Sequence, residues 1–259
     1  PDNGVAFVMY AACTADVKVA DNKKITVTEE TNYPFDENIT ITIDKGKAEF
    51  PLYLRIPSWT KNAEVYVNGE KQTVTPVSGK YYRINREWKK GDRVSLRVPM
   101  SLSMRRWQVN KNSVSVDYGP LTLSLKIKER YVKRDSKETA IHDSKWQKNA
   151  DASQWPTTEI YADSPWNYAL YLNPENALGD IEVVKKPWPA DNFPFTLENV
   201  PLEFKAKGRQ VPSWTLDATK LCGVLPDECA PKAATLDDIT LVPMGAARLR
   251  ISAFPTTDK

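Results

Sequence analysis

Alternation of apolar and polar residues is the feature that most narrows the folds open to this chain. The stretch "NITITID" at 38–44 places isoleucines on one side and threonines on the other, and "FPLYLRI" at 50–56 repeats the pattern with larger side chains. Successive side chains of a β-strand point to opposite faces, so this pattern is typical of strands with one buried face. It predicts that Leu52, Leu54 and Ile56 lie in a two-layer core.

Turn signals separate these strands. "AEVYVNGEK" at 63–71 contains Asn68-Gly69, a dipeptide that favours a tight hairpin because both residues tolerate positive φ. Short strands with a turn about every ten residues are typical of sandwiches and barrels. We therefore predict an all-β fold with two consecutive antiparallel β-sandwich (jelly-roll-like) domains, 1–100 and 101–259, because Pro99 ends a strand and the alternation then restarts.

The second domain is predicted to be interrupted by long loops. Gly119-Pro120 indicates a kink or bulge, since proline cannot donate a hydrogen bond to a neighbouring strand. From about 128 to 165 the chain becomes polar and lysine-rich, which predicts an irregular excursion with one helical turn. Strands are expected again at 166–172, 181–186, 201–208, 239–245 and 247–255.

The first residues resemble the interior of a protein. "PDNGVAFVMYAAC" predicts a turn at 2–4 and a buried strand at 5–12, and it contains no secretory signal peptide. We therefore expect the numbering to begin partway into a longer polypeptide. No apolar run approaches the roughly 18 residues that cross a bilayer, so no membrane span is predicted.

The charge balance argues against a polyanionic partner. The 36 basic and 33 acidic residues leave a net charge of +3, and the basic residues form no long run. The basic stretch 126–134 is interpreted as solvated surface, and no nucleic-acid partner is expected.

The cysteines and the single histidine, His142, limit metal chemistry. A structural zinc site normally needs four cysteine or histidine ligands, so neither a metal site nor a cofactor is predicted within this chain. Cys222 and Cys229 flank a short loop and could form a disulfide in an oxidising compartment, although sequence proximity does not establish the geometry. Cys13 ends an apolar strand and is expected to be a buried thiol.

No catalytic arrangement is evident. His142 has no nucleophile motif beside it, and the sequence has no phosphate-binding glycine loop. The adjacent acidic pairs, Glu29-Glu30 and Asp237-Asp238, are predicted to lie on the surface, because neighbours in a strand point to opposite faces. A pair of catalytic carboxylates formed by other acidic residues stays open, because the sequence does not give the distance between two side chains. We therefore predict no catalytic residue.

The eight tryptophans are further candidates for a binding site, because exposed aromatic rings can bind sugars. Trp166 and Tyr168 share a strand face with Leu170 and Leu172, which predicts that Trp166 is mostly buried. Trp155 and Trp188 stand beside prolines in loops, and they are the candidates for carbohydrate contact.

The order of several stretches resembles a known family. "TNYPFDENITITI", "FPLYLRIPSWTKNAEVYVNGE", "GKYYRINREWKKGDRVSLRVPM" and "SVSVDYGPLTLSL" resemble, in that order, the region after the catalytic barrel in glycoside hydrolase family 127. "YADSPWNYALYLN", "FTLENVPLEFKAKGRQVPSWTL" and "ITLVPMGAARLRISAFP" are similar to the final domain of a bacterial subgroup. The likeness extends over nearly the whole chain except about 128–155.

This resemblance implies an (α/α)6 catalytic barrel preceding two β-sandwich domains in the full-length protein, with a zinc-bound cysteine nucleophile in the barrel. No position of this chain matches a catalytic residue; Cys13 follows the first strand, whereas the family's adjacent cysteines precede it. The implied parent is a β-L-arabinofuranosidase-like hydrolase of carbohydrate metabolism, periplasmic or secreted, whose barrel is the partner of this fragment.

Three functions remain open from the sequence. The chain is a non-catalytic accessory region that supports the barrel, an autonomous carbohydrate-binding module for a plant-type, arabinose-containing polysaccharide, or a structural or adhesion-type sandwich. A coplanar pair of exposed rings would favour the module. A broad apolar patch on the first sandwich would favour the accessory region.

Overall fold

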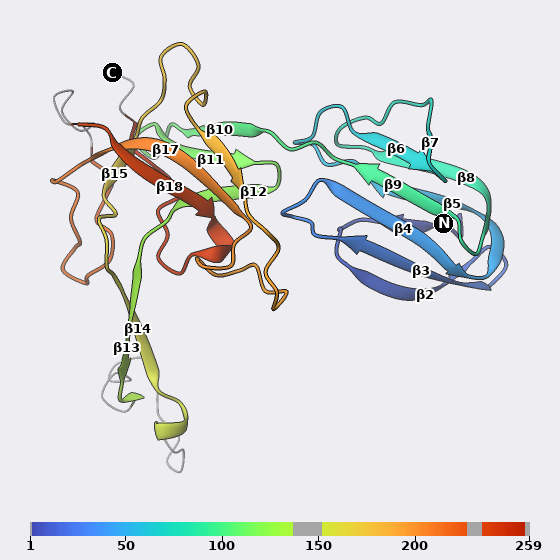
Figure 1. The fold of residues 1–259 in the computed structure, drawn as a ribbon, viewed down its shortest axis with the longest axis horizontal. Coiled ribbons are helices and arrows are strands. Elements are labelled where there is room, and N and C mark those ends of the chain that lie inside the picture. Colours follow the sequence, from blue (N-terminus) through green and yellow to red (C-terminus); the bar gives the residue numbers. More distant parts are fainter. Residues whose placement is uncertain (1, 137–151, 227–234, 257–259) are drawn as a thin grey trace. The chain divides into compact units, whose positions relative to one another are not determined.

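The structure, a computed structural model, describes residues 2–136, 152–226 and 235–256 (Figure 1). Strands dominate, and the described ranges also contain the short 3-10 helices Ala152–Gln154 and Met244–Ala246. The predicted all-β class is confirmed. The chain divides into a first unit, Pro1–Ser103 with Asp117–Leu121, and a second unit, Met104–Val116 with Thr122–Lys259. The predicted limits 1–100 and 101–259 stay a prediction.

The first unit contains two sheets. The smaller has the order β1 (Val5–Phe7), β5 (Lys47–Arg55), β8 (Tyr81–Lys89). The larger has the order β2 (Cys13–Val19), β3 (Lys23–Thr31), β4 (Asn38–Lys45), β9 (Arg93–Arg97), β6 (Glu64–Val67), β7 (Glu70–Lys71). β1 pairs with β5 in parallel, unlike the antiparallel pairing that was predicted. This pairing is possible because β2, β3 and β4 intervene and supply the long crossover that parallel neighbours need.

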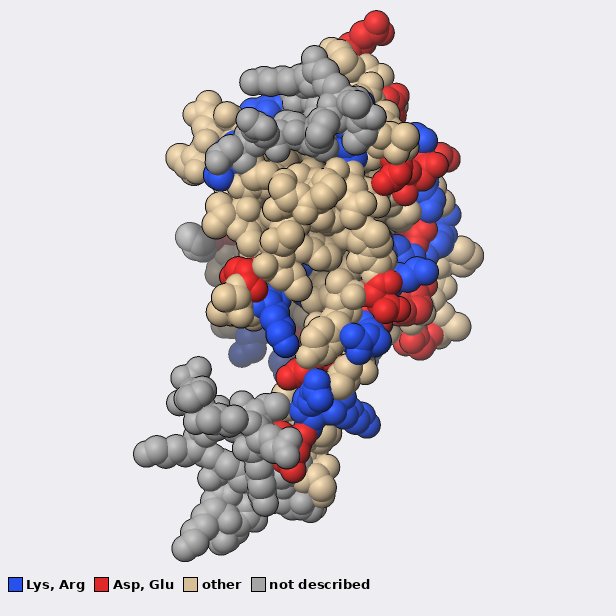
Figure 2. All heavy atoms as spheres, turned by 90° about the vertical axis from the view of Figure 1, so that its left-hand side faces the viewer, with Lys and Arg blue, Asp and Glu red and all other residues tan. Residues whose placement is uncertain are grey.

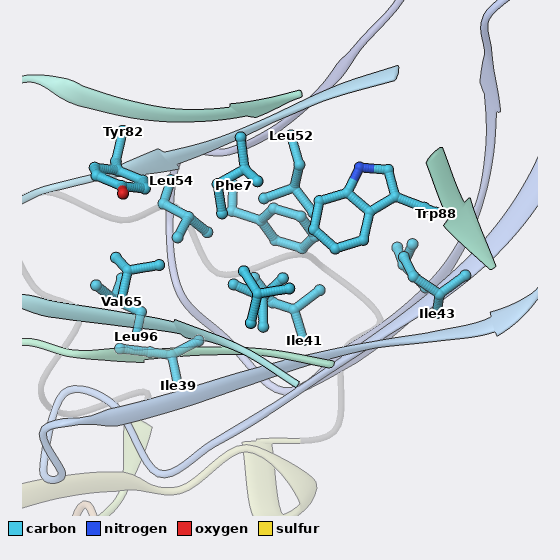
Figure 3. Packing of buried hydrophobic residues seen from close by; sticks show 14 of the residues in the cluster. Phe7, Ile39, Ile41, Ile43, Leu52, Leu54, Val65, Tyr82, Trp88 and Leu96 are labelled. Atoms are coloured by element: carbon cyan, nitrogen blue, oxygen red, sulfur yellow. The ribbon is translucent and has the colours of Figure 1, made fainter. Parts of the chain in front are cut away.

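A single core fills the space between these sheets (Figure 3). Leu52, Leu54 and Ile56 are at most 1% exposed, which confirms their predicted burial. Trp88 is fully buried, and its indole N–H donates to the Phe50 carbonyl over 3.0 Å. This bond satisfies the one polar atom that the ring brings into the core.

The Asn68-Gly69 turn is also confirmed. Both residues have positive φ, 52° and 86°, and they connect β6 to β7. Glycine tolerates this conformation without steric cost, and asparagine tolerates it better than most residues.

Two expectations about the first residues are wrong. β1 ends at Phe7 rather than at residue 12, and Val8 and Met9 are 47% and 80% exposed. The chain leaves the sheet there because β5 pairs with only Val5–Phe7. Cys13 is exposed rather than buried, because it begins β2 at the edge of the larger sheet.

The second unit is built on one seven-stranded sheet within the described residues. Its order is β10 (Leu102–Trp107), β11 (Ser113–Tyr118), β12 (Leu121–Leu125), β18 (Asp237–Pro243), β17 (Leu202–Gln210), β15 (Tyr168–Leu170), and β16 (Glu182–Lys185) also pairs with β17. β15 pairs with 208–210 and β16 with 202–205, so both lie along one edge of β17.

Three predictions for this unit need correction. The ends of the expected irregular excursion form a two-stranded arm, β13 (Glu129–Arg134) with β14 (Thr157–Ala162). Gly119-Pro120 makes the turn between β11 and β12, and Gly119 has φ 56°. The expected strand at 247–255 is irregular apart from a bridge between Phe254 and Val114, because most of its backbone groups do not pair with a neighbouring strand. The described part of the chain contains no helix long and apolar enough to cross a membrane.

Candidate functional site

Trp155 and Trp188 lie in separate loops of the second unit. Trp155 is 70% exposed, and its backbone carbonyl accepts a hydrogen bond from the Ser136 hydroxyl. Trp188 is half-buried, and its indole N–H donates to the Asn192 side-chain oxygen over 2.7 Å. Neither is a ring of the cavity described below. Carbohydrate contact by either ring stays a prediction.

The other predicted positions are partly described. Cys222 is exposed, whereas Cys229 lies outside the described residues, so their disulfide stays a prediction. Although the residue is exposed, partial desolvation of its sulfur and then the Asp217 carboxylate raise the pKa of the Cys222 thiol. His142 also lies outside the described residues. Within the described ranges, no group of three or more histidine, cysteine, aspartate or glutamate residues could hold a metal ion.

The alternation predicts that Trp166 is mostly buried, and in the structure it is of intermediate burial. It is only half-buried, whereas Leu170 and Leu172 are 0% and 2% exposed. The reason is that β15 begins at Tyr168, so Trp166 precedes the regular strand and is not fixed by its alternation. The ring of Trp166 packs edge-on against Trp214, with centroids 5.2 Å apart.

The backbone around Trp166 is firmly held. The side-chain amide of Asn167 donates to the carbonyls of Val211 and Trp214 over 2.9 and 3.1 Å, and the Val211 N–H donates back to the Asn167 carbonyl. The indole N–H of the buried Trp214 donates to the Gly223 carbonyl over 2.9 Å. These bonds join the Trp166 segment to the loop that follows β17.

Trp166 borders a cavity of about 510 Å³ in the second unit. Apolar side chains form much of its wall: Ile127, Ile160, Leu216, Leu221, Leu249 and Ile251. Glu159, Tyr161, Lys220 and Arg250 add polar groups. Figure 2 shows this unit from the left-hand side of Figure 1, with a broad area free of charged side chains and charges gathered at its border.

The wall formed by 215–223 is organised by Asp217. One of its carboxylate oxygens accepts hydrogen bonds from the Thr219 N–H, the Thr219 hydroxyl and the Leu221 N–H over 2.8, 2.6 and 3.1 Å. These bonds hold the pKa of Asp217 below its ordinary value. An aspartate that bonds its own downstream backbone in this way stabilises a tight turn. The turn places Lys220, whose φ is 62°, and Leu221 at the cavity.

The charged groups at the opposite wall are also constrained. Glu159 accepts hydrogen bonds from the Tyr161 hydroxyl over 2.6 Å and from Arg134 over 3.0 Å. The Tyr161 bond and then Arg134 lower the pKa of Glu159, and Lys220 contributes to the same shift. Glu159 therefore stays ionised at neutral pH as a hydrogen-bond acceptor.

A second hollow, of about 450 Å³, lies at the base of the arm and is lined mainly by charged residues. Glu129 accepts hydrogen bonds there from the backbone N–H groups of Arg248 and Leu249 over 2.6 and 3.1 Å, and from the Tyr131 hydroxyl. These contacts fasten β13 to the segment after β18, so this carboxylate has a structural role.

The first unit contains an acidic residue whose burial was not predicted. Glu29, predicted to lie on the surface, is 4% exposed and accepts a hydrogen bond from the Ala11 N–H over 3.0 Å. Burial raises its pKa to about 7. Nearby Tyr10 is buried as well, and its hydroxyl donates to the Arg55 carbonyl over 2.7 Å. The signal that was missed is the alternation of β3, because Glu29 shares the buried face of Ile25 and Val27, which are 1% and 4% exposed.

The fold and the site together define an all-β region with a core sandwich and a second sheet-based unit. Residues 4–100 match the family described as "Beta-L-arabinofuranosidase, GH127 middle domain". The resemblance seen in the sequence is thereby confirmed for these residues, which form a GH127-like β-sandwich region.

Solved structures show the same fold over the whole chain. A protein titled "Glycoside hydrolase" is 23% identical, with a TM-score of 0.62 over 98% of this chain and 36% of its own. A GH127 β-arabinofuranosidase is 19% identical, with a TM-score of 0.62 over 99% of this chain and 35% of its own. A GH127 β-L-arabinofuranosidase from Geobacillus stearothermophilus T6 is also 19% identical, with a TM-score of 0.61 over 99% and 34%. This chain spans about a third of their length, and no curated protein matches its sequence.

Proposed function

We propose that this chain is the non-catalytic accessory region of a β-L-arabinofuranosidase-like glycoside hydrolase. The observation that carries the proposal is the match of 4–100 to the GH127 middle domain, within a fold that covers 98–99% of this chain but only 34–36% of the solved hydrolases. A rigid sandwich would support the catalytic part of such an enzyme. A periplasmic or secreted location, and zinc in that catalytic part, belong to the same proposal and come from the family resemblance.

One surface of the first unit is suited to contact the rest of the enzyme. Val8 and Met9 are exposed, and the Arg55 side chain donates to the Val8 carbonyl over 2.6 Å. Arg55 pairs in register with Tyr81, which is 50% exposed. Exposed apolar side chains beside tyrosine and arginine are typical of protein interfaces. We assign the catalytic barrel as the partner of this surface.

The proposal is tested by assaying the purified chain on aryl β-L-arabinofuranosides with and without added zinc. We expect no turnover above the buffer rate, because the described residues offer no ligand group for the zinc. Zinc-dependent turnover by this chain would overturn the non-catalytic assignment. In the longer enzyme, Met9→Asp should lower the melting temperature, whereas Lys18→Asp, on a different sheet, serves as the matched control.

A carbohydrate-binding role is the second candidate, and one observation favours it. The cavity beside Trp166 combines an aromatic ring with apolar walls and a few fixed polar groups, as small-ligand sites generally do. Binding of sugar by the isolated chain is independent of hydrolysis, so the two candidates can both hold.

A further inference from the structure

We propose that the Trp166 cavity binds a short, neutral oligosaccharide, with one sugar ring against the indole of Trp166. This inference rests on the carbohydrate-binding candidate and not on the accessory role. It differs from the sequence prediction, which chose Trp155 and Trp188 and placed Trp166 in the core.

The size of the cavity suits such a ligand. Its volume of about 510 Å³ falls within the range of about 300–1,000 Å³ that is usual for small-ligand pockets. The described residues that line the cavity all belong to the second unit.

The position of Trp166 suits ring stacking. Trp214 packs against it edge-on, and the Asn167 amide clamps the adjoining backbone. The indole is therefore held in place before any ligand arrives, and little conformational entropy is lost on binding. Its π-face could contact the apolar C–H groups of a sugar ring, while the ring remains half-buried for support.

The polar groups suit sugar hydroxyls. Lys220 supplies N–H donors, and Glu159 supplies a carboxylate acceptor that Tyr161 and Arg134 keep oriented. Hydroxyl groups both donate and accept, so they can use both kinds of partner. A purely apolar ligand would desolvate these charged groups without offering them hydrogen bonds of its own, which is costly. Because both positive and negative side chains line the cavity, it also does not favour a polyanionic ligand.

Titration of the purified chain tests the proposal. Calorimetry with arabinotriose should detect binding, and Trp166→Ala should weaken it about ten-fold or more, by analogy with the loss of a stacked base. Lys220→Gln should weaken it a few-fold and leave the melting temperature unchanged. Trp155→Ala and Trp188→Ala, matched changes at rings outside the cavity, should bind as the parent chain does. Because Trp166→Ala could disturb the fold, Trp166→Phe is measured as well and should retain part of the affinity.

Each outcome has a separate meaning. Unchanged affinity in both Trp166→Ala and Lys220→Gln would overturn the cavity assignment while binding itself survived. Loss of affinity in Trp155→Ala or Trp188→Ala alone would move the site to that loop. No binding of arabinotriose, xylotriose or cellotriose by the parent chain would overturn this inference and the carbohydrate-binding candidate together. The accessory role would be unaffected, because the hydrolysis assay decides it.

Discussion

The two units of this chain bury their side chains in different ways. In the first, two sheets face each other, and almost every apolar position of β4, β5 and β9 is buried. In the second, the described strands form one large sheet and an arm, and irregular segments supply buried residues such as Trp214 and Phe254. Alternation within strands therefore specifies the first core almost completely, whereas the second core also depends on loops whose sequences carry no period.

The largest expected effect probes the first core. Trp88→Ala removes a fully buried ring and leaves the Phe50 carbonyl without its indole donor. We expect the free energy of unfolding to fall by about 3–5 kcal/mol, the usual range for such a truncation. Denaturant melts measure it. Leu54→Ala, at about 2–5 kcal/mol, is the control that creates a cavity without breaking a hydrogen bond. A loss below about 1 kcal/mol in both would contradict a closely packed sandwich.

The next prediction concerns pH and the buried Glu29. Its pKa is raised to about 7 from an ordinary 4.5, because burial disfavours the charged carboxylate. The folded protein therefore binds more protons than the unfolded chain between these values, and stability should fall as pH rises through this window. The full change is about 3 kcal/mol, since each pKa unit between 4.5 and about 7 corresponds to about 1.4 kcal/mol.

Glu29→Gln provides the comparison for this pH dependence. Glutamine keeps an oxygen that can accept from the Ala11 N–H but does not titrate. Melts of both proteins at several pH values should show the decline only in the parent chain. If the free energy of unfolding of Glu29→Gln fell equally with pH, groups other than Glu29 would be the cause of the pH dependence.

Leu54 and Glu29 show which features of the fold could be predicted from the sequence. The face of Leu54 follows from its strand neighbours, so its burial could be predicted. The face of Glu29 could have been predicted in the same way from Ile25 and Val27. Its hydrogen-bond partner could not, because the Ala11 N–H comes from the segment that follows β1. The Trp166 cavity was equally hidden, since its walls come from β14, the 215–223 turn and 249–251. The aspartate-threonine pattern of that turn was a readable local signal, but nothing in it indicated the partner segments.

A smaller effect is expected at Trp166, where the second unit departs most from strand alternation. A completely buried ring would cost about 3–5 kcal/mol on truncation. The half-buried ring seen here should cost about 1–2 kcal/mol, because part of its area is already exposed to water. Trp214→Ala, at a ring that is 3% exposed and hydrogen-bonded, should cost more. Equal losses in the two melts would show that Trp166 belongs to the core after all.

The smallest effect is expected at Trp155, the most exposed tryptophan among the described residues. Its contact with Ser136 uses the backbone carbonyl, which remains when the side chain is truncated. Trp155→Ala should therefore change the free energy of unfolding by no more than about 0.5 kcal/mol, as for most surface substitutions. A thermal melt beside that of Trp166→Ala makes the measurement. A loss above about 1 kcal/mol would mean that the Trp155 ring is buried in the folded chain. The loops of the second unit would then hold a further apolar cluster, and the contrast between its core and that of the first unit would narrow.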